Sequence, residues 1–178
     1  MSATVAAGLA ERILGAVREI PDFPEPGVSF KDITPLLGDG PLFGEVITAH
    51  AEPWSGRVDL VAGLEARGFI FGAAVARQLG VGFLPVRKAG KLPGETVGVD
   101  YELEYGTARV EIPAGALRPG TRVLVVDDVL ATGGTAAAAC RLLQEVGAEV
   151  TGVEILVEIE ALRGREAVAS TIRSLVTV

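Results

Sequence analysis

The chain has 178 residues, of which 49% are apolar, and because a chain of this length buries about two thirds of its unfolded surface in one core, we expect a single domain over residues 1–178. The net charge of −7 excludes an extended grip on nucleic acid, which requires Lys and Arg on several phosphates at once. The single cysteine excludes an internal disulfide framework, and the absence of a leader pattern or of an apolar run of about 18 residues predicts a cytoplasmic protein without a membrane span.

The first half of the chain predicts two helices and then a strand–helix–strand unit. Apolar residues at helical spacing predict helices over Ala3–Pro24 and Pro41–Trp54, joined by a connection rich in proline and glycine. A strand over Arg57–Gly63 follows, then a helix within Gly68–Gly80 whose last glycine lies past the helix end, and a strand over Val81–Lys88.

The second half predicts a hairpin and another strand–helix–strand unit. Charged and apolar residues alternate over Gly98–Pro113, which favours two exposed antiparallel strands forming a flap. A strand over Thr121–Asp128, a helix over Thr135–Gly147 and a strand over Glu149–Glu160 follow. This alternation predicts an α/β fold with a mostly parallel central sheet flanked by helices, which binds its ligand at the carboxyl ends of the strands.

Two adjacent carboxylates, Asp127 and Asp128, end the apolar run VLVV. Neighbouring residues of a strand point to opposite faces, so the two side chains need not crowd one another. Their oxygens suit sugar hydroxyls or a hard cation such as Mg²⁺. Two acids at the end of a buried strand are costly unless something binds them, which favours a ligand over a purely structural role.

Small residues follow the two acids in the sequence ATGGT, residues 131–135. Their backbone N–H groups can approach a phosphate closely, and the helix behind them directs its positive end to the same point. A P-loop would need a lysine where Thr135 stands, and the dinucleotide fingerprint G-x-G-x-x-G is absent. The pattern therefore indicates a site for a ribose 5-phosphate.

The string VLVVDDVLATGGT resembles the phosphoribosyl pyrophosphate motif of the type I phosphoribosyltransferases, in the version of their adenine-specific members. The segments FPEPGVSFKDITPLL, GLEARGFIFG, RKAGKLPG, LEYG and VEIEALRGRE match the family in order and spacing. The resemblance implies the type I phosphoribosyltransferase fold. It also implies a small N-terminal hood, built from about residues 1–40 and 158–166, and an antiparallel flap at about residues 88–112.

The resemblance assigns the two ends of phosphoribosyl pyrophosphate to different residues. Asp127 and Asp128 would meet the ribose 2′- and 3′-hydroxyls, and the 5′-phosphate would be wrapped by Ala131, Thr132, Gly133, Gly134 and Thr135. The pyrophosphate would contact Arg67, Arg87, Lys88 and Lys91. Without the resemblance, the last three cations are also explained as a solvated turn. A non-proline cis peptide, common in the family, would join Glu65 to Ala66.

The base pocket is assigned to the hood and to the segment near residue 160. Phe30 would stack on one face of adenine and Leu162 would cover the other, while the main chain at Ser29 and Lys31 would read the amino edge. The family often has arginine where this chain has Lys31, and a lysine offers no planar fork. The position of Ser29 is usually apolar in the family. Neither departure removes the expected backbone contacts.

Catalysis is assigned to Glu104 and Arg67. Breaking the bond to pyrophosphate builds positive charge on the ribose, so Mg²⁺, held mainly by substrate and water, and the arginines would stabilise the leaving group. Glu104 would manage a proton on the purine, and Tyr105 would be a flap contact. Closure of the flap would exclude water from the cation-like sugar. Taken alone, Glu104 is also explained as an outward-facing acid of a strand.

The implied reaction of purine salvage converts adenine and phosphoribosyl pyrophosphate to AMP and pyrophosphate, in an enzyme that is usually a homodimer. Two other hypotheses stay open, which are a transferase for another purine and a non-catalytic sensor of the same sugar phosphate. The acidic charge and the presence of Glu104, Arg67 and the acidic pair favour the enzyme.

Three single residues are expected to have structural roles. His50, the only histidine, is predicted at the surface or at a helix end. Cys140 is predicted to be a small buried hydrophobe, and Trp54 to pack under a loop.

Overall fold

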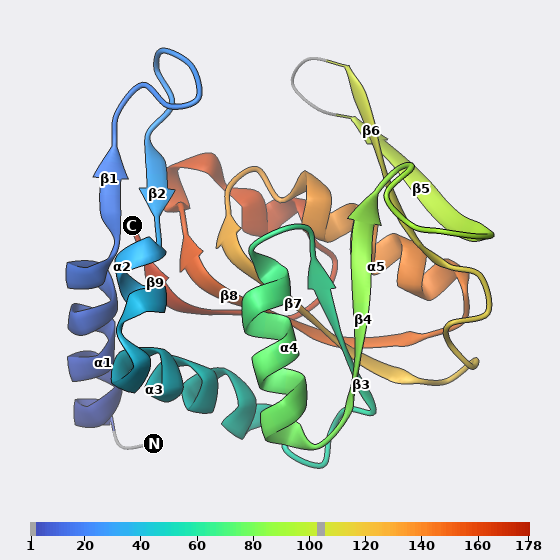
Figure 1. Ribbon diagram of the computed structural model, residues 1–178, viewed down its shortest axis with the longest axis horizontal. Coiled ribbons are helices and arrows are strands. Elements are labelled where there is room, and N and C mark those ends of the chain that lie inside the picture. Colours follow the sequence, from blue (N-terminus) through green and yellow to red (C-terminus); the bar gives the residue numbers. More distant parts are fainter. Residues whose placement is uncertain (1–2, 103–105) are drawn as a thin grey trace. The chain divides into compact units, whose positions relative to one another are not determined.

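The central strands form where the sequence has unbroken apolar runs. The computed structural model describes residues 3–102 and 106–178. Its main sheet has seven strands in the order β5–β6–β4–β3–β7–β8–β9 (Figure 1). Five of them are mutually parallel: β4 (Gly82–Lys88), β3 (Leu60–Leu64), β7 (Arg122–Leu130), β8 (Glu149–Glu158) and β9 (Ile172–Thr177). The predicted α/β fold with a mostly parallel sheet is confirmed.

Two crossover helices position the carboxyl ends of the strands. Helix α4 (Gly68–Leu79) joins β3 to β4, and α5 (Gly134–Glu145) joins β7 to β8 (Figure 1). Since these connections run in opposite directions along the sheet and crossovers are right-handed, the two helices cover opposite faces. The strand order therefore reverses between β3 and β7, which is where an α/β sheet binds its ligand. Gly80 ends α4 with φ 71°, as predicted. Among the described residues, no helix has the length and apolar character to cross a membrane.

The hairpin consists of β5 (Thr96–Glu102) and β6 (Thr107–Pro113), which pair antiparallel as predicted. The prediction that both strands are exposed is wrong for Val110–Ile112, which is buried. Strand β6 also pairs with β4, so it extends the main sheet instead of standing clear of it. Its apolar side chains then join the core over α5.

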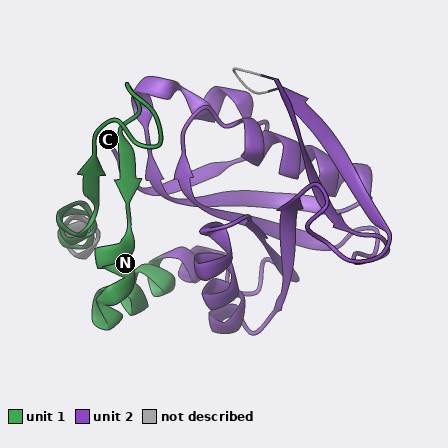
Figure 2. Ribbon diagram, turned by 45° about the horizontal axis from the view of Figure 1, so that its top comes forward, with its two compact units in different colours: residues 1–49 green, residues 50–178 purple. Residues whose placement is uncertain are grey.

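Contacts between Cα atoms divide the chain into two compact units, residues 1–49 and 50–178 (Figure 2). The first unit contains α1 (Ala3–Ala16), β1 (Arg18–Ile20), β2 (Phe30–Asp32), α2 (Thr34–Gly38) and most of α3 (Gly40–Ala51). The predicted continuation of the first helix to Pro24 is wrong, because Ile20 precedes a proline and is restricted to extended backbone. Residues 18–20 pair antiparallel with β2 instead. The single-domain span, with its hood and flap bounds, stays a prediction.

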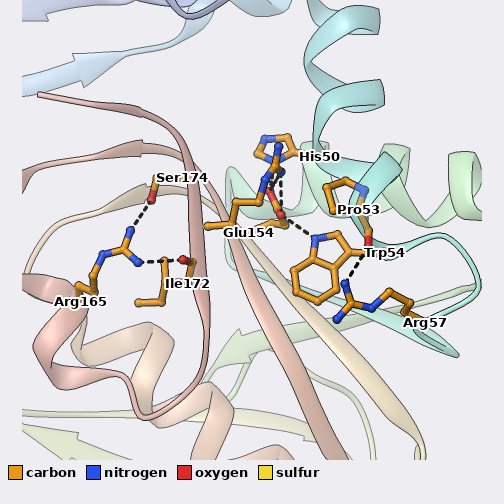
Figure 3. A network of polar contacts seen from close by, with 9 residues as sticks. His50, Pro53, Trp54, Arg57, Glu154, Arg165, Ile172 and Ser174 are labelled. Atoms are coloured by element: carbon orange, nitrogen blue, oxygen red, sulfur yellow. Dashed lines mark hydrogen bonds and ion pairs between the residues drawn. The ribbon is translucent and has the colours of Figure 1, made fainter. Parts of the chain in front are cut away.

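The second unit contains a buried polar network on strand β8, at Glu154 (Figure 3). Its carboxylate accepts a hydrogen bond of 2.6 Å from the indole of Trp54 in η1 (Glu52–Trp54), and lies 2.8 Å from Nδ1 of His50. Arg173 of β9 supplies the charge, with one guanidinium nitrogen 2.9 Å from both carboxylate oxygens. The carboxylate of Glu154 therefore connects the end of α3, η1 and β9 to strand β8.

His50, Trp54 and Cys140 are all buried. His50 lies at a helix end, one of its two predicted positions, since it is in the last turn of α3; it is fully buried there, because Glu154 provides a polar partner inside the protein. Trp54 is buried against strand β8, where a Cβ on Gly152 would overlap its ring, and the guanidinium of Arg57 in the following turn lies over the ring, 5.1 Å from its centroid, so a loop covers part of it as predicted. Cys140 is buried as predicted, and burial raises the pKa of its thiol to about 11.

Candidate active site

The loop after β3 lies against the end of β7. Its peptide bond between Glu65 and Ala66 is cis, as predicted, and Arg67 is the residue before the first turn of α4. Gly68 allows the close approach, since a Cβ there would lie 2.7 Å from a carboxylate oxygen of Asp127 and 2.8 Å from the carbonyl oxygen of Val126. Both strands that flank the switch point therefore contribute to one site.

Asp127 and Asp128 face different neighbours, as expected for adjacent strand residues. Strand β7 continues to Leu130, so the prediction that it ends at the two acids is wrong by two residues. Asp127 lines the hollow formed by the following loop, whereas an oxygen of Asp128 lies 2.8 Å from Nε of Arg67. The backbone N–H of Asp128 donates to the side chain of Asp127 over 2.9 Å.

Burial controls the charge of this acidic pair. Removal from water raises the pKa of Asp127 well above its ordinary value, and the neighbouring charge of Asp128 raises it further. Burial also raises the pKa of Asp128, which is 4% exposed, and the guanidinium of Arg67 opposes that rise. The two carboxylates therefore hold protons more firmly than solvated aspartates do. A ligand that donates hydrogen bonds to them would favour their ionised form.

Residues 131–135 form a short loop that enters α5 and encloses a hollow of about 90 Å³, which we call the loop hollow. Gly133 has φ 80°, a conformation that favours glycine, and no described side chain caps the helix that follows. The first backbone N–H groups of a helix have no partner within it, and they carry partial positive charge. The loop hollow is lined by Asp127, Val129, Leu130, Ala131, Thr132, Gly133, Gly134, Thr135 and Ala136.

A second hollow of about 150 Å³, which we call the cationic hollow, shares Asp127 and Thr135 with the loop hollow. The two hollows therefore adjoin at these residues. The cationic hollow is lined by Leu64, Glu65, Val86, Arg87, Lys88, Val110, Asp127 and Thr135. One hollow offers backbone donors and the other offers cationic side chains, which is an arrangement suited to a ligand with an anionic group at each end.

Glu65 organises the cationic hollow, a role that the sequence did not predict. The guanidinium of Arg87 donates to both of its oxygens, over 3.0 and 3.3 Å, and the backbone N–H of Lys88 donates over 2.9 Å. The hydrogen bonds from Arg87 lower the pKa of Glu65. Arg87 also donates to the carbonyl oxygen of Lys91 over 2.7 Å, and the side chains of Lys88 and Lys91 are exposed.

The residues predicted for the base lie in both units. In the first unit, Phe30 begins β2 and makes an edge-to-face contact with Phe23, with ring centroids 5.1 Å apart. Lys31 and Ser29 share one partner, since the ammonium lies 3.2 Å from a carboxylate oxygen of Glu19 and the hydroxyl donates to the same carboxylate. Ser29 and Lys31, the two residues that differ from the usual family pattern, therefore both contact Glu19.

The remaining predicted residues lie in the second unit or outside the described residues. Leu162 ends η2 (Glu160–Leu162) and is 47% exposed. The next segment, η3 (Gly164–Ala167), lies against the loop hollow, since a Cβ on Gly164 would overlap the carbonyl oxygen of Ala131. Glu104 and Tyr105 lie outside the described residues. Within the described residues, no group of three His, Cys, Asp or Glu side chains is placed to hold a metal ion.

Known proteins resemble the chain over almost its whole length. The family model for the phosphoribosyl transferase domain matches residues 46–177. The adenine phosphoribosyltransferase of Thermobifida fusca is 58% identical over 164 residues, which cover 91% of this chain and 93% of that protein.

Solved structures agree with the sequence comparison. The crystal structure of adenine phosphoribosyltransferase from Rhodothermus marinus has a TM-score of 0.93 and 45% identity, covering 97% of this chain and 99% of that one. The Saccharomyces cerevisiae enzyme, crystallised with adenine and an imino-altritol bisphosphate, has a TM-score of 0.90 and 39% identity, covering 95% and 99%. The chain therefore belongs to the phosphoribosyltransferase family and, within it, to the adenine phosphoribosyltransferases.

Proposed function

We propose that the protein transfers the phosphoribosyl group of phosphoribosyl pyrophosphate to adenine, which yields AMP and pyrophosphate. The observation that carries the proposal is the pair of adjoining hollows that share Asp127 and Thr135. Phosphoribosyl pyrophosphate has a phosphate at one end and a pyrophosphate at the other, with a pentose between them. The names of the relatives, and the adenine in the yeast crystal, support the same assignment.

The loop hollow would bind the 5′-phosphate. Backbone N–H groups of residues 131–135 and the hydroxyls of Thr132 and Thr135 would donate to its oxygens, next to the positive end of α5. Asp127 and Asp128 would accept hydrogen bonds from the ribose hydroxyls. Arg67 beside Asp128 favours the ionised carboxylate that this contact requires.

The cationic hollow would bind the pyrophosphate. Arg67, Arg87, Lys88 and Lys91 are the proposed contacts. The positive charge of Arg87 is already paired with Glu65. The two exposed lysines, Lys88 and Lys91, would therefore supply the positive charge that is still available for the pyrophosphate. The guanidinium of Arg87 donates to the carbonyl oxygen of Lys91. This hydrogen bond would hold the turn that carries Lys91 next to the guanidinium.

Mg²⁺ fits this site as an ion held by the substrate. Glu65 is engaged by Arg87 and Asp128 by Arg67, which leaves Asp127 as the carboxylate shared by the two hollows. Mg²⁺ keeps several waters and takes oxygens from substrate phosphates, so it would be held mainly by substrate and water and not directly by the protein. When bound, the ion would neutralise charge on the leaving pyrophosphate.

The transfer exchanges one bond at the anomeric carbon for another. The bond to the pyrophosphate oxygen breaks and a bond to a ring nitrogen of adenine forms, through a transition state with oxocarbenium character. Arg67 would stabilise the leaving group, and Glu104 would take the proton that the purine releases. A flap carrying Tyr105 would close over the sugar and exclude water. Adenine would stack between Phe30 and Leu162, with its amino edge read by the main chain at Ser29 and Lys31.

The proposal includes a homodimer in the cytoplasm. The apolar content of 49% is compatible with a buried interface between two copies. A single cysteine, buried in the fold, is consistent with a reducing compartment.

The decisive assay supplies the protein with phosphoribosyl pyrophosphate, Mg²⁺ and, one at a time, adenine, hypoxanthine, guanine, xanthine and orotate. We expect nucleotide from adenine alone. Product from another base would identify a different transferase, and binding of phosphoribosyl pyrophosphate without any product would favour a sensor. Glu104→Gln should lower turnover strongly and leave the affinity for phosphoribosyl pyrophosphate nearly intact. Unchanged turnover would remove Glu104 from the mechanism.

A further inference from the structure

Tyr101 of β5 joins the hairpin to a residue of the loop hollow. Its phenolic oxygen lies 3.2 Å from Oγ1 of Thr135. Thr135 lines both hollows, whereas Tyr101 lines neither. The tyrosine ring packs against the core over α5 and lies beside the first turn of that helix, where a Cβ on Gly134 would be 3.6 Å from it. The ring is thus held by packing, and its hydroxyl is directed at a proposed phosphate ligand.

A second contact holds the same strand to α5. The guanidinium of Arg141 donates to the carbonyl oxygen of Asp100, the residue before Tyr101. The carboxylate of Asp100 in turn lies 3.1 Å from the guanidinium of Arg109 on β6. Two consecutive residues of β5 are therefore attached to the helix that begins at the loop hollow. Only one of these attachments, through Tyr101, ends on a residue of that hollow.

The hydrogen bond between Tyr101 and Thr135 can run in either direction, because each hydroxyl can donate or accept. A threonine hydroxyl has one hydrogen to donate and two lone pairs that accept. If Thr135 donates to Tyr101, its hydrogen is not available for a phosphate. If Tyr101 donates to Thr135, the threonine hydrogen is free to point into the loop hollow. A bound phosphate, which accepts hydrogen bonds only, selects the second arrangement.

We propose that Tyr101 is a positioning residue for the 5′-phosphate of the substrate, acting through the hydroxyl of Thr135. The inference rests on the proposed function and adds to it a residue that does not touch the substrate. Tyr101 lies in β5, and Glu104 follows it three positions later in the sequence. Phosphate binding at the loop hollow is thereby linked to the hairpin that carries the proposed catalytic Glu104.

The test measures the binding of ribose 5-phosphate and of phosphoribosyl pyrophosphate by calorimetry, together with KM values for both substrates. Tyr101→Phe keeps the ring and removes only the hydroxyl. We expect both sugar phosphates to bind roughly 3- to 10-fold more weakly, as for the loss of one hydrogen bond, with an unchanged KM for adenine. Thr135→Val should weaken binding further. Adding Tyr101→Phe to it should have no additional effect, because the threonine hydroxyl through which Tyr101 acts is already absent.

Arg141→Met is the matched control, since it releases the other attachment of β5 without touching Thr135. We expect it to leave the affinity for ribose 5-phosphate unchanged. An equal loss in Arg141→Met and Tyr101→Phe would overturn the inference, because attachment of the strand would then explain the effect. Unchanged binding by Tyr101→Phe would also overturn it. If the wild-type protein itself bound neither sugar phosphate, the proposed function would fail first, and this inference with it.

Discussion

The guanidinium of Arg67 lies 2.8 Å from a carboxylate oxygen of Asp128. This ion pair joins the loop after β3 to the end of β7, which are the two strands on either side of the switch point. Arg67 was predicted to contact pyrophosphate and Asp128 to contact ribose, so the ion pair connects the proposed contacts of two adjacent groups of the substrate. It also keeps a buried carboxylate compensated before the ligand arrives.

The first prediction concerns Asp128→Asn. We expect the KM for phosphoribosyl pyrophosphate to rise about tenfold or more, because a charged acceptor for a ribose hydroxyl is lost, with a smaller effect on kcat. Steady-state kinetics at saturating adenine measure both parameters. Asp59→Asn is the control, since Asp59 forms an exposed ion pair with Arg122. An unchanged KM in the Asp128 variant would remove it from the ribose site.

The second prediction concerns Asp127→Asn and the pH dependence of stability. Because burial and Asp128 raise the pKa of Asp127, the folded protein binds this proton more tightly than the unfolded chain does. Stability then falls as pH rises from the ordinary value of about 3.9 through the raised pKa. Asp127→Asn should therefore raise the melting temperature at pH 8 while weakening the binding of phosphoribosyl pyrophosphate.

Asp59→Asn supplies a control of opposite sign for this pH experiment. Hydrogen bonds from Arg122 lower the pKa of Asp59 to about 2. Its contribution to stability is present above the ordinary pKa and is lost as pH falls towards the lowered one. The control should therefore lower the melting temperature at pH 8. A lower melting temperature in both variants would contradict the raised pKa of Asp127.

The third prediction concerns Gly133→Ala. Gly133 has φ 80°, and a Cβ there would overlap the carbonyl oxygen of Gly164, so both the backbone and the packing oppose a side chain. Gly115 has φ 71° with nothing within 4 Å, so Gly115→Ala measures the backbone strain alone, about 1 kcal/mol. Urea unfolding should show a larger loss for Gly133→Ala, together with lost AMP binding. Equal losses in the two variants would show that the contact with Gly164 is unimportant.

The fourth prediction concerns Glu19→Gln in the first unit. Glu19 lies opposite Lys31 in the β1–β2 pair, and hydrogen bonds from Ser29 and Lys31 lower the pKa of its carboxyl group. The substitution removes the charge that holds both side chains, so the backbone proposed to read adenine loses its support. We expect the KM for adenine to rise severalfold while that for phosphoribosyl pyrophosphate is unchanged. Glu45→Gln, which breaks an exposed ion pair with Arg12 in the same unit, should change neither constant.

The fifth prediction concerns Arg173→Met. This change leaves the fully buried carboxylate of Glu154 without its cation, while Trp54 still donates to it. We expect the free energy of unfolding to fall by about 3 kcal/mol, since a buried ion pair that loses one partner is strongly destabilising. Arg12→Met, at an exposed pair, should have little effect on urea unfolding. A similar small effect of Arg173→Met would mean that Glu154 is compensated in another way.

Local sequence patterns predicted those features of the fold and the site that are determined by a few consecutive residues. The apolar run before Asp127 and the glycines after it identified a strand, a turn and a helix start. Gly80 marked a helix end. These features are encoded within a few residues, because backbone conformation and strand alternation are local properties.

Partners distant in the chain were not predictable in the same way. His50 was expected at the surface or at a helix end, and its burial could not be predicted, because its partner Glu154 lies 104 positions later. Glu65 was singled out only for its peptide bond, whereas its role depends on Arg87, 22 positions away. Strand β1 has three residues, too few for a periodic pattern, and forms because β2 is there to pair with it.

A crystal structure of the protein with AMP tests the central claim most directly. We predict electron density for the phosphate in the loop hollow, within hydrogen-bonding distance of the backbone N–H groups of residues 132–135. The ribose hydroxyls should lie on the carboxylates of Asp127 and Asp128. Density for the nucleotide at any other place, with the loop hollow holding only water, would contradict the assignment of this site.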